Sequence, residues 1–247
     1  MKPCLLEICA GSYESACAAR EGGAARLELC SGLSEGGLTP SVGLIKAVLG
    51  LSGIRKHVLI RPRSGDFLYT PAEVDIMVED IRCVRELGAD GVVVGSLTAE
   101  GGIDLPALRR MKEAAGTMSV TFHRAFDVCA WPAQALEQLI EAGCDRVLTS
   151  GQARSAEDGV PLLRELVRQA AGRIVVMPGC GVNPGNAAYI LKETGATELH
   201  ASARATVASH MSYRNPEAKM GQPGRDEYER QETSVAQVRS LVAALQG

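Results

Sequence analysis

Carboxylate and thiol side chains recur at alternate positions within two short apolar segments of this 247-residue chain. Glu7 and Cys9 are two residues apart in the first segment, and Glu28 and Cys30 repeat the pair in the second. Side chains two residues apart lie on the same face of a strand. The two segments therefore predict one surface that carries two thiols and two carboxylates.

The two thiols suggest a metal site. Thiolates are soft ligands, and soft ligands select Cu(I). The alternative is that Cys9 and Cys30 are small core residues, a common role of buried cysteines. The eight cysteines include no C-x-x-C pair, and the chain has no H-E-x-x-H spacing. Neither pattern of a zinc site is therefore present.

Basic residues and a histidine follow two other apolar segments. Arg61 and Arg63 are two apart, so both guanidinium groups are expected to point at one spot and hold a carboxylate or phosphate. His123, Arg124 and Asp127 follow another segment. In this interpretation Arg124 also holds the anion, and His123, Asp127 or one of the two glutamates transfers protons. The pattern predicts an enzyme that acts on a small anionic or sugar-like metabolite.

Further candidates lie near the C-terminus. His200 and Ser202 share the alternation of Glu198, and both are expected to face a ligand. Gly179 and Gly181 belong to a turn that leads into a predicted helix, whose backbone N–H groups would bind an anion. An ordinary tight turn is the alternative for the two glycines.

Eight short apolar segments alternate with eight amphipathic ones. The first set is predicted to form parallel strands covered on both faces, at residues 4–9, 25–30, 57–61, 91–95, 119–123, 146–149, 173–177 and 198–201. Helices are predicted for residues 13–22, 41–51, 73–87, 105–115, 132–142, 158–171, 184–194 and 234–246. Eight such units predict one α/β domain over residues 1–247, a (β/α)8 TIM-like barrel. A doubly wound sheet is the alternative, but no G-x-G-x-x-G loop follows the first strand.

Nearly all of these candidates stand at the C-terminal ends of the predicted strands, where the active sites of such barrels lie. Charged groups inside a barrel need partners. We therefore expect Glu7, Glu28 and Glu198 to face Arg61 and Arg63. An ion-pair network that only fills the barrel is the structural alternative. His57, which opens a strand, is expected to be structural or solvated.

Composition excludes several partners. The net charge of −3 and the 4% aromatic content argue against nucleic acid, and no basic excess favours an anionic membrane surface. No apolar run reaches the roughly 20 residues of a membrane span. The first apolar segment contains Glu7 and is too short for a signal peptide. Scattered cysteines do not suggest a disulfide framework. These observations predict a cytoplasmic protein.

A polar connection at residues 204–233 separates the last strand from the last helix. Loops of this length are usually lids, arms or disordered segments. Met211, Tyr213, Met220 and Tyr228 are candidate anchors. Part of the segment is predicted to pack over the barrel mouth or at a subunit contact of a homo-oligomer.

Four segments closely resemble the copper homeostasis protein CutC family. They are ELCSGLSEGGLTPS at 28–41, IRPRSGDF at 60–67, VTFHRAFD at 120–127 and RVLTSG at 146–151. The likeness runs from Leu6 to Met220. It implies a TIM-like barrel and a cytoplasmic protein linked to copper tolerance, with Cu(I) bound at cysteines that match Cys9 and Cys30.

The chain departs from the family pattern at two positions. Ser64 stands where the family usually has glycine, and Cys180 stands in a turn that is usually all glycine and adds a third thiol. The resulting expectation is a copper homeostasis protein that binds Cu(I) through Cys9 and Cys30. The metabolite enzyme is the alternative, and a non-catalytic chaperone or scaffold that uses the 204–233 segment is a third class.

Overall fold

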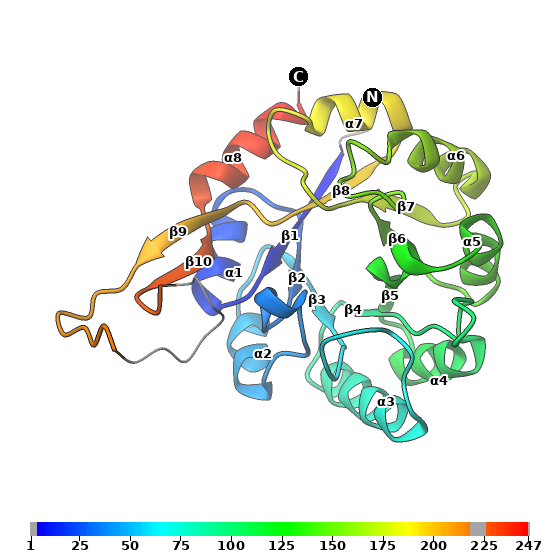
Figure 1. The fold of residues 1–247 in the computed structure, drawn as a ribbon, viewed down its shortest axis with the longest axis horizontal. Helices are drawn as coiled ribbons and strands as arrows, with labels where there is room; N and C mark the ends of the chain where they lie inside the picture. The colour runs from blue at the N-terminus through cyan, green and yellow to red at the C-terminus, as the bar shows by residue number, and fades with distance from the viewer. Residues whose placement is uncertain (1–3, 218–225, 247) are drawn as a thin grey trace.

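The computed structural model describes residues 4–217 and 226–246 and contains a barrel of eight parallel strands. The strands are β1 (Leu5–Ala10), β2 (Arg26–Leu29), β3 (Arg55–Leu59), β4 (Gly91–Val94), β5 (Ser119–Phe122), β6 (Arg146–Thr149), β7 (Val175–Pro178) and β8 (Glu198–Ala201). Their order is β7-β6-β5-β4-β3-β2-β1-β8. Figure 1 shows β7 beside β8, so the ring is nearly closed.

Eight α-helices surround these strands in the part of the chain that the structure describes (Figure 1). They are α1 (Tyr13–Glu21), α2 (Val42–Leu49), α3 (Pro71–Glu86), α4 (Leu105–Ala115), α5 (Pro132–Glu141), α6 (Val160–Ala170), α7 (Ala187–Thr194) and α8 (Val235–Ala244). The predicted (β/α)8 barrel is confirmed. No helix within the described ranges is long and apolar enough to cross a membrane.

Local sequence signals set most helix starts. Thr70 and Glu73 form a capping box at α3, and Pro71 occupies its first position. Helix α7 begins three residues later than predicted. The Asn183 side chain accepts from the backbone N–H of Gly185 (2.9 Å), so residues 183–186 form a turn before the helix.

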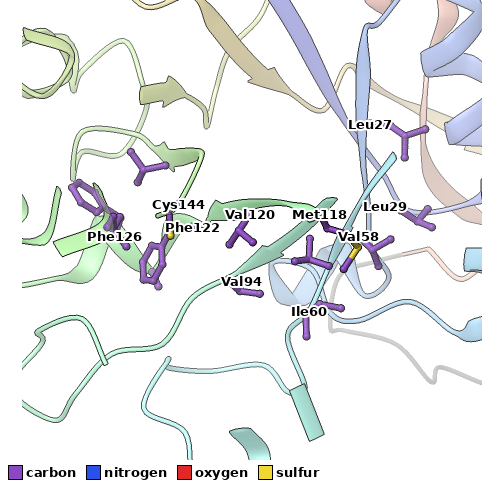
Figure 2. Packing of buried hydrophobic residues seen from close by; sticks show 14 of the residues in the cluster. Leu27, Leu29, Val58, Ile60, Val94, Met118, Val120, Phe122, Phe126 and Cys144 are labelled. Carbon is purple, nitrogen blue, oxygen red and sulfur yellow. The ribbon is translucent and has the colours of Figure 1, made fainter. Parts of the chain in front are cut away.

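Alternation along the strands divides the core into two layers. Val58, Ile60, Val120 and other apolar residues belong to the main hydrophobic cluster, which also contains the buried residues of the helices. Figure 2 shows part of this cluster. Residues of the opposite alternation face the barrel axis. One small apolar cluster there contains Cys9, Cys30, Leu59 and Val93. The axis also holds buried ionisable residues, namely Glu7, Arg26, Glu28, His57, Arg146 and Glu198.

The connection between β8 and α8 forms an arm. Strands β9 (Arg204–Ala208) and β10 (Glu229–Thr233) pair in antiparallel fashion, and Figure 1 shows this ribbon projecting outward past α1. The arm is fixed at its base, because Glu232 accepts from the hydroxyls of Ser12 and Ser15 (both 2.5 Å). Residues 204–208 and 229–233 thus form a β-ribbon where the sequence predicted only a long polar connection.

The candidate anchors of the arm have different positions. Met211 and Tyr213 are exposed. The Tyr228 hydroxyl instead accepts from the backbone N–H of Asn215 (2.6 Å) within the arm. Met220 lies outside the described residues. Contact of the arm with a second copy of the chain stays a prediction.

Candidate functional site

An ion-pair network fills the N-terminal half of the barrel axis. The Arg26 guanidinium donates to Glu7 and, at 2.5 Å, to Glu198. Arg146 reaches the same Glu198 carboxylate (3.1 Å) and the hydroxyl of Ser119 (2.7 Å). The expectation that Arg61 and Arg63 face the acidic residues is therefore wrong, because two arginines at the starts of β2 and β6 take that place.

Above this network, His200 lies between two carboxylates. Its Nδ1 is 2.8 Å from Glu7 Oε1, and its Nε2 is 3.8 Å from Glu28 Oε2. Burial opposes a charge on His200, but Glu28, Cys9 and Glu7 together raise its pKa well above the usual value. The pKa of Glu7 is lowered because the hydrogen bond with His200 and the Arg26 charge outweigh burial. Burial raises the pKa of Glu28.

The thiols of Cys9 and Cys30 meet beside His200. Their Sγ atoms are 3.5 Å apart, as the alternation of both strands predicts. The hydrogen bond with Cys30, together with burial, raises the pKa of Cys9 well above its usual value. Cys9 Sγ, a Glu28 carboxylate oxygen and a His200 ring nitrogen all lie within 4.8 Å of one another. Strands β1, β2 and β8 thus bring sulfur, oxygen and nitrogen ligands to one place.

Arg61 and Arg63 do not point at one spot. Arg61 Nη1 donates to the carbonyls of Glu35 (2.7 Å) and Gly37 (2.9 Å), and its Nη2 donates to that of Gly65 (2.8 Å). Arg63 pairs with Glu73 (2.5 Å) and with Asp66 (3.0 Å) at the surface. Arg61 thus holds two loops in place, and the paired anion fork expected from the sequence does not form.

His123 and Asp127 have different hydrogen-bond partners and do not bond to each other in the described residues. His123 Nδ1 accepts from the backbone N–H of Ala125 (3.1 Å), and its buried Nε2 has no hydrogen-bond partner within the described ranges. Burial, with the Arg61 charge, lowers the pKa of His123 to about 3. At neutral pH His123 is therefore an uncharged imidazole whose proton is on Nε2.

Asp127 and Arg124 fasten the loop that follows β6. Asp127 accepts from the backbone N–H groups of Ser150 (2.9 Å) and Gln152 (3.2 Å) and from the Thr149 hydroxyl (2.5 Å). Arg124 donates to Asp127 (2.7 Å). All of these contacts are internal to the protein, so the geometry favours loop positioning for both side chains.

The glycines after β7 have packing roles. At Gly179 a Cβ atom would lie 2.5 Å from Leu148 Cδ1 and 3.2 Å from His200 Cβ. Gly179 therefore makes room for the closure of β7 on β8 and for the His200 side chain. Gly181 has φ +74°, a conformation that favours glycine.

Anion binding by the backbone of this turn stays a prediction, and two of its groups are already bonded within the protein. The backbone N–H of Asn183 is bonded to the Asn186 side chain (2.9 Å). The Cys180 thiol donates to the carbonyl of Arg154 (3.2 Å). Ser202 follows β8 and is half-buried. None of these residues belongs to the cluster of Cys9, Glu28 and His200 that the described ranges contain.

The sequence analysis did not single out Arg26 or Arg146, and it left open whether His57 is structural or solvated. Arg26 lies two residues before Glu28, so strand alternation already placed it on the inner face. His57 is two residues before Leu59 and faces the axis for the same reason. Its Nδ1 has no partner among the described residues.

We expect His57 to make the protein less stable in acid. Burial, with the charges of Arg26 and Arg146, outweighs Glu7 and lowers the pKa of His57 to about 4, whereas an unfolded chain has a histidine pKa of about 6.5. Below pH 6.5 the unfolded chain therefore binds the proton first, and the free energy of unfolding falls until about pH 4. Between pH 7 and pH 5 this residue contributes a loss of about 2 kcal/mol.

Urea unfolding of wild type and His57→Gln at both pH values measures this contribution. The variant should lose about 2 kcal/mol less than wild type on acidification, whatever its stability at pH 7. The same loss in both proteins would show that His57 is not the residue responsible.

Comparison with known proteins places this barrel in a family. A sequence model of the CutC family matches residues 4–205. A family protein CutC of Bacteroides fragilis (strain YCH46) is 53% identical over 247 residues, which cover 99% of this chain and 98% of the relative. A family protein CutC of Chromobacterium violaceum is 55% identical over 241 residues, which cover 98% of this chain and 98% of the relative.

Solved structures agree. A crystal structure described as the putative copper homeostasis protein CutC of Streptococcus agalactiae has 36% identity and a TM-score of 0.76, covering 80% of this chain and 97% of that one. Thiamine phosphate pyrophosphorylase from Pyrococcus furiosus, with 16% identity and a TM-score of 0.60 over 98% and 95% of the two chains, shares the fold. The family match and the relatives that are more than half identical lead to one conclusion: the chain belongs to the CutC family.

Proposed function

We propose that this protein takes part in copper homeostasis by binding Cu(I) as cargo between Cys9 and Cys30. The observation that carries the proposal is the 3.5 Å separation of the two Sγ atoms. The structural relative from Streptococcus agalactiae bears the copper homeostasis name, and this chain has the thiol pair that such a role needs.

The residues present fit Cu(I). Two thiolates are the soft ligands that Cu(I) prefers, and the apolar neighbours Leu59 and Val93 surround them. Both thiols are buried, so a bound ion would be protected from water. Because both thiols are free, binding requires no prior reduction of a disulfide within the protein.

The free thiols also support a cytoplasmic location. None of the eight cysteines forms a disulfide in the structure, and disulfides are rare in reducing compartments. The proposed location is therefore the cytoplasm. The metabolite-enzyme alternative has less support, because the arginine fork on which it depends does not form.

Cu(I) competition tests the proposal. Reduced protein is titrated without oxygen against a chromogenic Cu(I) chelator, with wild type beside the double variant Cys9→Ser/Cys30→Ser. We expect the double variant to bind Cu(I) at least about 100-fold more weakly, which corresponds to ~2.7 kcal/mol.

Cys144→Ser is the matched control. Cys144 is also a buried free cysteine, but it belongs to the apolar layer beneath the helices. Its Cu(I) affinity should equal that of wild type. Equal affinity of the double variant and wild type would refute the two-thiolate site, and loss of affinity in Cys144→Ser as well would point to a general effect on folding.

A further inference from the structure

We propose that Cys9, Glu28 and His200 form a second metal site, which binds a divalent ion with the same ligand preferences as zinc. The site shares Cys9 with the Cu(I) pair but does not require that copper binds there. Its ligands come from β1, β2 and β8, which are neighbours in the barrel.

The spacing of the three ligand atoms fits a single ion. Cys9 Sγ, a Glu28 oxygen and a His200 nitrogen lie within 4.8 Å of one another. Zinc–ligand bonds of about 2.0–2.3 Å in a tetrahedron place the ligand atoms about 3.3–3.8 Å apart. His200 Nε2 and Glu28 Oε2 are 3.8 Å apart, which is too long for a hydrogen bond. Small side-chain movements, together with release of the Cys9 and His200 protons to solvent, therefore bring the three ligand atoms onto one ion.

The mixture of ligand types distinguishes this site from the thiol pair. Zinc accepts thiolate, imidazole and carboxylate ligands together, whereas Cu(I) favours sulfur. One thiolate and one carboxylate also balance the charge of a divalent ion.

A second carboxylate orients the histidine as metal sites require. Glu7 is held by Arg26 and can only accept, so His200 Nδ1 carries the hydrogen that points at Glu7 Oε1 (2.8 Å). Nε2 is thereby turned toward Cys9 and Glu28. Histidine ligands usually donate their other N–H to a carboxylate, which fixes the tautomer and the ring orientation. The barrel supplies this support before any ion binds.

The position and number of the ligands indicate what the ion would do. The site lies toward the C-terminal ends of its strands, where barrels of this class place their active sites. Three protein ligands leave a fourth coordination position, as in catalytic rather than structural zinc sites. That position would take an exchangeable ligand that binds through oxygen. The ion would act as a Lewis acid and polarise this ligand.

Zn(II) competition with a chromogenic chelator tests the site in reduced full-length protein. We expect wild type to bind one equivalent, and we expect Glu28→Gln and His200→Gln to weaken binding by about 100-fold or more. Glu7→Gln should weaken it by about 10–100-fold, because it removes support for a ligand. Cys30→Ser should keep most of its Zn(II) affinity while it loses Cu(I) affinity. His210→Gln, an exposed histidine in the arm, is the control.

Co(II) provides a readout in wild type that does not depend on a variant folding. A bound Co(II) ion should show a sulfur-to-cobalt charge-transfer band, and this band should be lost in Cys9→Ser but kept in Cys30→Ser. Absence of the band in wild type would overturn the proposal. Unchanged Zn(II) affinity in Glu28→Gln and His200→Gln, with folding verified by circular dichroism, would overturn it as well.

The experiments can refute either metal proposal without refuting the other. If wild type binds Zn(II) through Glu28 and His200 but shows no Cu(I) binding that depends on Cys30, the divalent site stands and the copper proposal is refuted. If Cys30→Ser removes both metals while Glu28→Gln removes neither, the thiol pair is the only metal site and the divalent proposal is wrong.

Discussion

Arg26→Met is expected to destabilise the protein by about 3–5 kcal/mol. Arg26 is completely buried and ion-paired with both Glu7 and Glu198. Methionine fills a similar volume but removes the arginine from the buried Glu7 carboxylate, which then has only His200 as a charged partner. Removing one partner of a buried pair costs more than the pair contributes, because the remaining charge stays buried. The free energy of unfolding in urea at pH 7 measures the loss.

Arg63→Met is the control for this prediction. Arg63 also pairs with two carboxylates, Asp66 and Glu73, but at the surface, where water solvates the carboxylates that remain. Its effect should be much smaller than that of Arg26→Met. If both substitutions have equal effects, burial is not what makes the Arg26 pairs important.

The second large effect is expected for Asp127→Ala, at about 3 kcal/mol. Two backbone N–H groups and the Thr149 hydroxyl donate to this carboxylate, and Thr149 and Ser150 are fully buried. Alanine leaves the buried Ser150 N–H and Thr149 hydroxyl without this acceptor, and each unsatisfied buried donor costs about 1–3 kcal/mol. Asp127→Asn keeps one carbonyl oxygen and should lose less stability.

Hydrogen exchange locates the effect of Asp127→Ala. Amide protection at Ser150 and Gln152 should fall in the alanine variant more than in the asparagine variant. The protection of amides in β1 and β2 should fall only by the amount that the loss of global stability accounts for. Unaltered protection at Ser150 would contradict the loop-fastening role and would reopen a direct chemical role for Asp127.

The barrel could be predicted because its evidence is local and repeated. Each strand is a short apolar segment, and alternation assigned Glu7, Cys9, Glu28 and Cys30 to one face without knowledge of the strand order. The meeting of the two thiols follows from that assignment, since β1 and β2 are neighbours in the sheet.

The partners of the charged residues could not be predicted in the same way. Arg26 reaches Glu198, a residue 172 positions later in the chain, and no local pattern reports such a contact. Arg63 shows a different limit. Strand β3 ends at Leu59, so Arg63 lies in a loop, where two-residue spacing no longer fixes the direction of a side chain. The prediction of the arginine fork assumed strand alternation at residues that lie beyond the end of the strand.

The charged barrel axis has a consequence for folding specificity. β1 and β2 are neighbouring parallel strands with Cys9 opposite Glu28. A slip of one residue would turn Glu7 and Cys9 toward the apolar layer and bring Ile8 into the ionic interior. Such a misregistered strand would bury Glu7 away from Arg26 and His200, which costs far more than exchanging one aliphatic side chain for another. The interior charges therefore select against slipped barrels that an aliphatic interior would tolerate.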